Sequence, residues 1–124
     1  MSKDALKRKR RRAYFRGKAA EFMATNYLRL KGYHIVANGY RKPFGEIDIV
    51  ARRNNLLIAV EVKSRHRMSD AAEAISTKQK RRIGRALEAF VMERPKFNGF
   101  NLRFDVLLIV SFWQKPTHIE GAWE

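Results

Sequence analysis

The stretch that decides the fold is GEIDIVARRNNLLIAVEVKSR, residues 45–65. Two apolar runs flank an Asn-Asn pair at positions 54–55, and Asn tolerates the positive φ that a two-residue hairpin turn requires. The stretch therefore predicts a β-hairpin. In the register set by that turn, Asp48 faces Glu61 across the two strands, and Lys63 projects from the same face as Glu61. Each strand thus carries charge inside an otherwise apolar pattern.

Two carboxylates in directly opposite positions repel each other, so this pairing needs a compensating positive charge. A divalent metal would supply it, because Mg²⁺ is commonly bound by one or two carboxylates together with waters and phosphate oxygens. The first interpretation of Asp48 and Glu61 is therefore a metal site, with Lys63 beside it to orient or deprotonate an attacking water. The second interpretation is an ion-pair cluster of these three side chains on the solvated face of a one-sided sheet. The spacing alone leaves both open.

The rest of the chain predicts further helices and strands around this hairpin. Apolar residues recur at helical spacing from Phe15 to Leu30, which predicts a helix over about residues 14–31. A second amphipathic helix is expected to be capped by Ser76 or Thr77 and to end at Pro95. Strands are expected at residues 33–41, 45–52, 56–64 and 101–113, with a short edge strand at 118–123. The predicted order is α-β-β-β-α-β, and Ile47, Ile49, Val60 and Val62 are all expected on the sheet face opposite the charges.

The length and composition favour one compact domain. The chain has 124 residues, of which 45% are hydrophobic, and we expect a single domain over residues 14–124. Its longest apolar runs are much shorter than the ~20 residues of a membrane-spanning helix. The chain has no cysteine, which excludes disulfides, a thiolate nucleophile and a cysteine-based zinc site. We therefore expect a soluble protein of the cytoplasm, with no membrane as its partner.

The charge balance points to a polyanionic partner. The formal net charge is +15, of which residues 1–18 carry +8 and the remaining residues +7. Residues 1–13 are expected to form a basic, disordered tail, but the body stays basic without it, and nucleic acid is the expected partner. An anionic membrane surface and RNA binding without chemistry, as in ribosomal proteins, are the alternatives. The expected phosphate contacts are Lys7, Arg8, Lys9, Arg10, Arg11, Arg12, Arg65, Lys78, Lys80, Arg81 and Arg82.

The start of the second helix breaks a local rule. Lys78, Lys80, Arg81 and Arg82 crowd its first turns, where the helix dipole favours acidic side chains. This pattern suggests phosphate contacts, while a solvated basic face is the alternative. Gln79 falls on the apolar stripe of the same helix, so it is expected to point toward the sheet, where it could orient the substrate.

Asp48 and the EVK motif at 61–63, within this order of elements, resemble the PD-(D/E)xK nuclease superfamily, which includes the archaeal Holliday-junction resolvases. The segments GEIDIVAR, VEVKSR, AAEAI, KQKRR and RFDVLLI are more closely similar to the YraN family of bacterial proteins, which is assigned to that nuclease fold. The likeness runs from about Gly17 to Trp123. It implies an α/β fold with a restriction-endonuclease-like αβββαβ core, in which helices flank a mixed central sheet.

The resemblance also implies roles for individual residues. Asp48 and Glu61 match the metal-binding acids, and the backbone carbonyl of Val62 matches a further metal ligand. Lys63 matches the active-site lysine, and Glu21 matches an acid on the first helix that reaches the same site. Glu21 also lies on a partly apolar helix face, where a free carboxylate needs a reason, although an ordinary exposed glutamate is the alternative.

The function implied by the resemblance is that of an endonuclease dependent on Mg²⁺ or Mn²⁺. It would act on branched or otherwise structured DNA, rather than RNA, as a homodimer and leave a 5′-phosphate. A non-catalytic nucleic-acid-binding module with a nuclease fold is the alternative. The chain departs from the patterns at Ile47, where the superfamily has proline, and at Ala20, where the YraN pattern usually has glycine. Neither departure removes a charged group.

Overall fold

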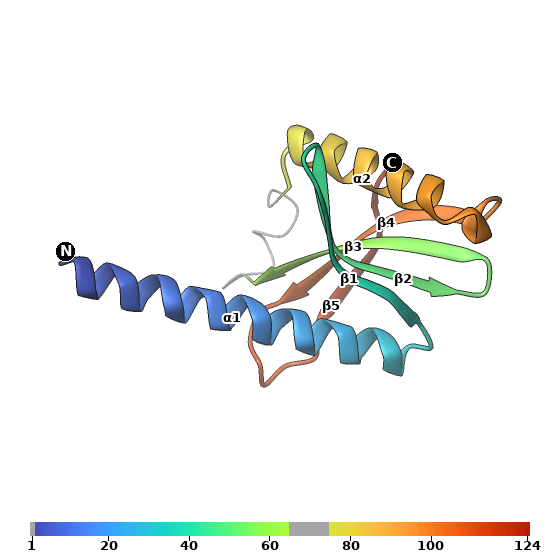
Figure 1. Ribbon diagram of the computed structural model, residues 1–124. Helices are drawn as coiled ribbons and strands as arrows, with labels where there is room; N and C mark the ends of the chain where they lie inside the picture. The colour runs from blue at the N-terminus through green and yellow to red at the C-terminus, as the bar shows by residue number, and fades with distance from the viewer. Residues whose placement is uncertain (1, 65–74) are drawn as a thin grey trace.

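The computed structural model describes residues 2–64 and 75–124, without the side chains of residues 13–16. The order of elements is α-β-β-β-α-β followed by an edge strand, as expected (Figure 1). The elements are α1 (Lys3–Leu30), β1 (His34–Lys42), β2 (Gly45–Arg53), β3 (Leu56–Ser64), α2 (Thr77–Glu93), the 3-10 turn η2 (Pro95–Phe97), β4 (Asn101–Ile109) and β5 (Thr117–Trp123).

The sheet is mixed, and its spatial order is β1-β2-β3-β4-β5. The pairs β1–β2, β2–β3 and β4–β5 are antiparallel, whereas β3 and β4 are parallel. The parallel pair requires a crossover connection, which includes α2. Because α1 and α2 lie on opposite faces of the sheet (Figure 1), the predicted α/β class with a helix-flanked mixed sheet is confirmed.

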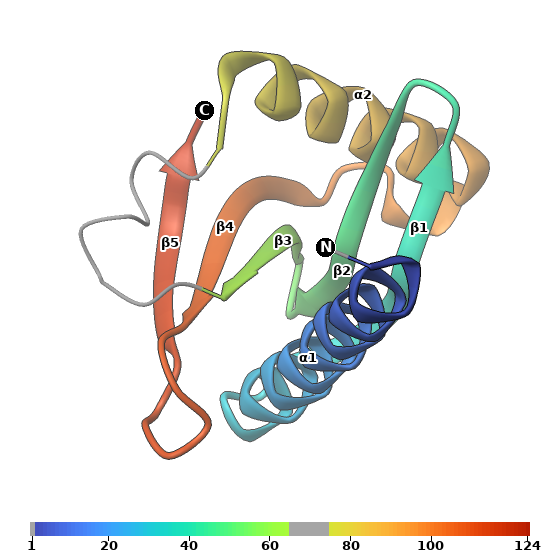
Figure 2. The same ribbon diagram turned by 90° about the vertical axis from the view of Figure 1, so that its left-hand side faces the viewer.

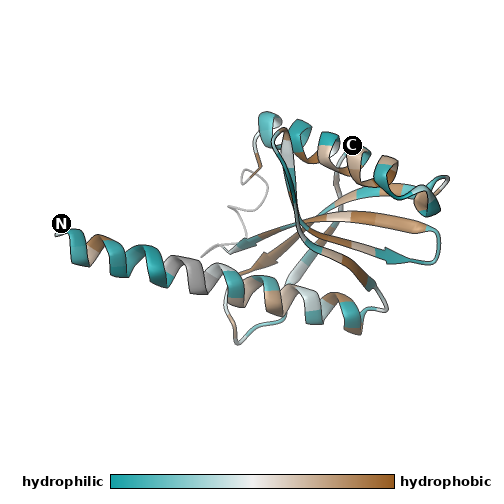
Figure 3. Cartoon of the chain, viewed as in Figure 1, coloured by the Kyte–Doolittle hydropathy of each residue, from teal (hydrophilic) through white to brown (hydrophobic). Residues whose placement is uncertain are grey.

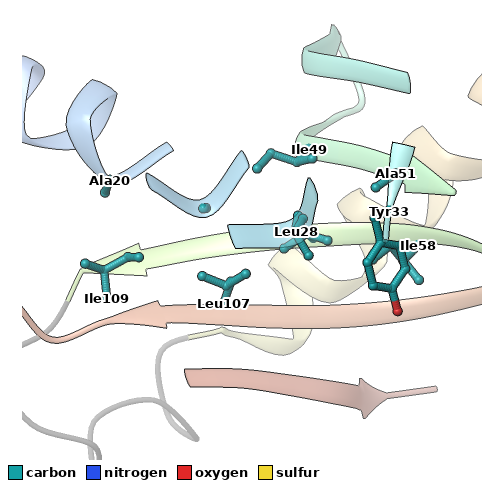
Figure 4. Packing of buried hydrophobic residues seen from close by; sticks show 10 residues of the cluster. Ala20, Leu28, Tyr33, Ile49, Ala51, Ile58, Leu107 and Ile109 are labelled. Carbon is teal, nitrogen blue, oxygen red and sulfur yellow. The ribbon is translucent and has the colours of Figure 1, made fainter. Parts of the chain in front are cut away.

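Both faces of the central strands are buried, which explains their nearly continuous apolar runs. On the α1 face, small residues of the helix meet branched residues of β2, β3 and β4 (Figure 4). The members of this cluster include Ala20, Ala24, Leu28, Ile49, Ile58, Val60, Leu107 and Ile109. On the α2 face, Ile83, Ala86, Leu87 and Phe90 of α2 pack with Val50, Leu57 and Ala59 of the sheet.

The buried face of α1 is not the one that the apolar spacing predicts. Phe22 and Leu30 are 73% and 87% exposed, whereas Ala24 and Leu28 are fully buried. The helix contacts the sheet through small alanines, which allow a close approach. With this face toward the sheet, the larger Phe22 and Leu30 point into solvent. Phe22 and Leu30, although they belong to the apolar pattern that predicts the helix, are therefore not core residues.

The basic tail expected to be disordered is helical from Lys3 onward, so α1 starts well before residue 14. The Ser2 hydroxyl accepts a hydrogen bond from the Ala5 amide, and Asp4 lies in the first turn, where the helix dipole favours an acid. The following Lys, Arg and Leu residues are strong helix formers. This half of α1 extends beyond the sheet and is mostly hydrophilic (Figures 1 and 3). In the described part of the chain, no helix has both the length and the apolar composition of a membrane span.

The hairpin of β2 and β3 has the predicted register. Asn54 has a φ of 55°, and the pairs run from Arg53 with Leu56 to Ile49 with Val60. Ile49, Val60 and Val62 share one sheet face, as expected, and pack in the cluster with α1, but Ile47 packs in the cluster around α2. Ile47 packs there because the start of β2 is in close contact with α2.

Gly45 permits this close approach of β2 to α2. A Cβ atom at Gly45 would overlap the backbone carbonyl of Arg82 on α2. Any side chain at this position would therefore push the strand away from the helix. The contact brings the first residues of β2 beside the first turns of α2, and this juxtaposition positions the site described below.

Candidate metal and active site

The site lies where the ladder between β2 and β3 ends. The last pair is Ile49 with Val60, and the next residue on each strand is Asp48 and Glu61. Asp48 Oδ2 accepts a hydrogen bond of 2.8 Å from the Val62 amide. This bond holds the Asp48 carboxylate of β2 against the backbone of β3, the strand that carries Glu61 and Lys63.

Glu61 is held by two donors from different elements. Its side chain is nearly buried, since the residue is 8% exposed. Glu61 Oε1 accepts a hydrogen bond of 2.9 Å from Gln79 Nε2 and lies 3.3 Å from Lys63 Nζ. Gln79 is on the first turn of α2, where its backbone amide donates to the capping hydroxyl of Ser76 at 3.1 Å. The expectation that Gln79 points toward the sheet is met.

Within residues 2–64 and 75–124, Lys63 is the cation that acts on both carboxylates. Burial and the charge of Asp48 together raise the pKa of Glu61 to about 7, although the Lys63 ammonium opposes both effects. Burial also raises the pKa of Asp48, which the Val62 amide opposes and Glu21 reinforces. Glu61 therefore changes charge near neutral pH, mainly because it is buried.

Two further acids lie close enough to act on this pair. Glu21 of α1, whose side chain is 35% exposed, raises the pKa of Asp48 through its charge and pairs with Lys18 at 3.7 Å. Glu46 raises the pKa of both Asp48 and Glu61, and it was not among the residues expected at the site. Its position two residues before Asp48, on the same face of β2, is the signal that could have identified it.

The donor set fits Mg²⁺ or Mn²⁺. Within residues 2–64 and 75–124, no three His, Cys, Asp or Glu side chains are grouped tightly enough to hold a metal by themselves. Asp48 and Glu61 offer two carboxylates, which is the number that Mg²⁺ commonly uses when waters and phosphate oxygens complete its shell. Burial is the largest cause of the raised pKa of both acids, and the charges of nearby carboxylates add to it, so a cation bound here would be stabilised by both.

The predicted phosphate-binding residues fall into two groups. The first group is exposed on the N-terminal half of α1, remote from the sheet, and comprises Lys7, Arg8, Lys9, Arg10, Arg11 and Arg12. The second group, Lys78, Lys80, Arg81 and Arg82, surrounds Gln79 on the first turns of α2. Arg65 lies outside the described residues. Of the predicted phosphate contacts that the structure describes, the α2 group is the one on the same helix as Gln79, which bonds to Glu61.

A second buried carboxylate, which sequence reasoning missed, lies on β4. Asp105 is fully buried and accepts hydrogen bonds from Arg103 Nε and Nη2, both at 2.8 Å, and from the Gly121 amide at 3.0 Å. His118 Nε2 lies 2.7 Å from Asp105 Oδ2, and Lys31 Nζ lies 2.6 Å from His118 Nδ1. Since Lys31 can only donate, the His118 proton is on Nε2 and points to Asp105.

The surroundings of Asp105 stabilise its charge. Burial alone would raise its pKa, but the hydrogen bonds from His118 and Arg103 lower the pKa of Asp105 to about 2. Arg103 also donates to the Tyr33 hydroxyl at 3.0 Å. This cluster ties β5 and the end of α1 to β4, and every charge in it has a partner, so it holds the fold together and is not a vacant site.

Comparison with known proteins places these residues in a family. The model of the family described as "Uncharacterised protein family UPF0102" matches residues 20–109. The chain belongs to the UPF0102 family. The matched range includes the five side chains expected at the site, which are Glu21, Asp48, Glu61, Lys63 and Gln79. The resemblance to the YraN family is thereby confirmed.

Relatives within UPF0102 cover nearly the whole chain. A UPF0102 protein of Nitrobacter winogradskyi is 46% identical over 112 residues, which cover 90% of this chain and 94% of the relative. A UPF0102 protein of Rhodopseudomonas palustris BisB18 is also 46% identical, over 90% of this chain and 82% of its own. One from Mesorhizobium japonicum is 40% identical over 92% of this chain and 90% of its own.

Proposed function

We propose that this protein is an endonuclease that depends on Mg²⁺ or Mn²⁺ and acts on branched or otherwise structured DNA. The observation that carries the proposal is the pair of neighbouring carboxylates, Asp48 and Glu61, with raised pKa values and one lysine beside them. A structural ion cluster would compensate its charges, as the Asp105 cluster does. A bound metal would compensate the negative charges of Asp48 and Glu61, and a phosphate of the substrate would complete the shell of that metal.

Each residue has a separate part in this chemistry. Asp48 and Glu61 would bind the metal, with the Val62 carbonyl as a further ligand. A bound divalent metal supplies Lewis-acid polarisation of the phosphate and a lower pKa for its water. Lys63, 3.3 Å from Glu61, would orient the attacking water with its remaining N–H groups. Gln79 would keep Glu61 in place through its hydrogen bond of 2.9 Å.

The surface around the site supports a polyanionic substrate. A pocket of about 220 Å³ lies beside Glu21, and its walls include Lys18 and Arg29 of α1. The α2 group of cations lies on the other side of the site. Contacts from Lys and Arg to phosphates do not read bases, so binding should weaken steeply with salt and show little sequence preference.

The proposal is tested by incubating the protein with linear, nicked, single-stranded, flapped and four-way DNA in Mg²⁺ or Mn²⁺. Wild type should cut at least one of these, and Lys63→Ala should not. Lys96→Ala is the matched control, because Lys96 is an exposed lysine in η2, after the end of α2 that is opposite to Gln79. If no DNA is cut, or if Lys63→Ala cuts as fast as wild type, the endonuclease proposal fails.

A non-catalytic nucleic-acid-binding module is the second candidate. The exposed cations on the N-terminal half of α1 favour it, because they could bind phosphates without the carboxylates. Calorimetric titration with Mn²⁺ separates the two, since only the enzyme requires a saturable site that Glu61→Ala removes.

We further propose a homodimer, because paired cleavage of a symmetric junction needs two sites. Light scattering after size exclusion would contradict it by showing a monomer at all concentrations.

A further inference from the structure

A larger pocket lies between α2 and the edge formed by β4 and β5. Its volume is about 640 Å³, within the range of small-ligand sites. Its walls include Lys80 and Arg81 of α2, Phe104 of β4 and Trp123 of β5. β5 ends beside the first turns of α2 (Figure 2). Because Lys80 directly follows Gln79, which holds Glu61, the pocket and the carboxylate site share one helical turn.

The pocket contains a fixed aromatic plane beside a cation. The rings of Trp123 and Phe104 are stacked, with centroids 5.2 Å apart and planes at 14°. Lys80 Nζ lies 6.0 Å from the centroid of the Trp123 ring. Stacking on aromatic side chains is the usual, sequence-tolerant contact to unpaired bases, and Lys and Arg bind the accompanying phosphates. Glu88 and Glu124, also on the walls, can accept hydrogen bonds from the amino group of a base.

Gly84 supports the view that the pocket is kept open. Glycine in the interior of a helix is destabilising, so its presence in α2 needs a reason. Gly84 does not have positive φ, and a Cβ atom placed on it would meet nothing within 4 Å. Neither backbone conformation nor close packing therefore requires glycine. What the missing side chain does provide is space on the wall of the pocket.

We propose that this pocket binds one unpaired nucleotide of the DNA strand, with its base against Trp123 and its phosphate at Lys80 and Arg81. The inference rests on the proposed function, and it narrows the substrate class to DNA with an unpaired or extruded nucleotide close to the cleaved phosphate. A free nucleoside monophosphate presents the same chemistry, so the experiment includes both.

Trp123 itself provides the test. The chain has two tryptophans, and Trp113 is 95% exposed, so Trp113→Phe leaves Trp123 as the only one. In chelator, this variant is titrated with dAMP, with a single-stranded dA oligonucleotide and with a fully paired duplex while Trp123 fluorescence is recorded. Both the oligonucleotide and dAMP should quench it saturably and compete with each other, and the duplex should quench weakly.

Gly84→Leu should fill the pocket and raise the apparent Kd for the oligonucleotide at least tenfold. Gly17→Leu is the matched control, since Gly17 is also helical with nothing within 4 Å of a Cβ, and it should change nothing. If Gly84→Leu does not fold, Trp123→Leu, tested by fluorescence polarisation of a labelled oligonucleotide, should show the same loss.

Absence of quenching, quenching by dAMP alone, or equal quenching in Gly84→Leu would overturn the proposal. The Glu61→Gln variant separates it from the endonuclease proposal, because that variant should lose cleavage but keep the quenching. Cleavage by wild type without quenching would remove the pocket proposal alone. Quenching sensitive to Gly84→Leu, without cleavage of any DNA, would remove the endonuclease proposal alone.

Discussion

Glu61 on β3 and Asp105 on β4 are buried acids on adjacent strands, yet their pKa values are shifted in opposite directions. Asp105 is contacted by Arg103, His118 and the Gly121 amide, and its pKa falls to about 2. Glu61 is contacted by the neutral Gln79 amide and by Lys63, while Asp48 repels it, and its pKa rises to about 7. Burial is therefore common to both sites, and within the part of the chain that the structure describes the charges of their neighbours distinguish them.

The difference separates a structural cluster from a candidate site. A buried acid whose charge is matched contributes to the folded state, and its removal leaves its partners buried and unpaired. A buried acid whose charge is poorly matched costs stability, so its presence requires another explanation, for which a ligand is the simplest. The predictions below test this contrast, starting with the largest expected effect.

Replacing Asp105 by Asn should lower the free energy of unfolding by about 3–5 kcal/mol, because Arg103 and His118 lose their buried anionic partner. Replacing Glu61 by Gln, the equivalent change at the other acid, should not lower it at neutral pH. Urea unfolding followed by circular dichroism measures both. Equal losses in the two variants would contradict the contrast.

The stability of the metal-free protein should fall as pH rises from about 4.5 to 7. Folded Glu61 keeps its proton up to about pH 7, whereas the unfolded chain releases it near 4.5. The folded state therefore binds more protons in this window, and the free energy of unfolding should decrease by about 3 kcal/mol. The difference between wild type and Glu61→Gln, measured by urea unfolding in chelator, isolates this effect. A constant difference across the window would show that the pKa of Glu61 is not raised.

Asp105 should produce the opposite dependence in acid. Its pKa is about 2 in the folded state and 3.8 ordinarily, so its contribution is complete above about pH 4 and lost as pH falls through 2. The expected loss is about 2 kcal/mol. The carboxyl ¹³C shift of Asp105 in acid titrations by NMR would report the folded pKa directly. A midpoint at or above 3.8 would rule out the matched cluster.

Excess Mg²⁺ or Mn²⁺ should raise the free energy of unfolding of wild type, because a bound cation offsets the repulsion between the carboxylates of Asp48 and Glu61. At a metal concentration ten times Kd the gain is about 1.4 kcal/mol, because the ligand binds only the folded state. Thermal melting at pH 8 should show the gain in wild type and Tyr33→Phe, which perturbs only the Asp105 cluster. Glu61→Gln should not respond. An identical response of wild type and Glu61→Gln would mean that no metal site exists at this pair.

Much of the fold was predictable because its signals are local. The Asn54-Asn55 turn and the alternation of β2 and β3 set the register, and the pairing of Arg53 with Leu56 follows from them. The order of elements and the start of α2 at a Ser76 cap follow from periodicity and capping. The grouping of the site residues was predictable for the same reason. A hairpin carries Asp48, Glu61 and Lys63, and the first turn of one helix carries Gln79.

The features that were missed depend on contacts between distant parts of the chain. Apolar spacing did not tell which face of α1 would be buried. Ala20 and Ala24 are buried because their small side chains allow the helix to approach the sheet closely. The bend that turns Ile47 toward α2 depends on the contact of Gly45 with Arg82. The Asp105 cluster joins Lys31 of the α1 end to His118 of β5, which are 87 positions apart.

The sequence by itself determined which acids and bases stand at the end of the hairpin, because residue type and strand alternation are local properties. Only the tertiary structure decided their protonation. The pKa of a carboxyl depends on the solvent removed around it and on charges brought from other elements. For Glu61 these are Asp48 and Lys63, with Gln79 from α2 as its donor, and for Asp105 they are Arg103 and His118. Two acids of similar local sequence pattern thus become opposites once the chain has folded.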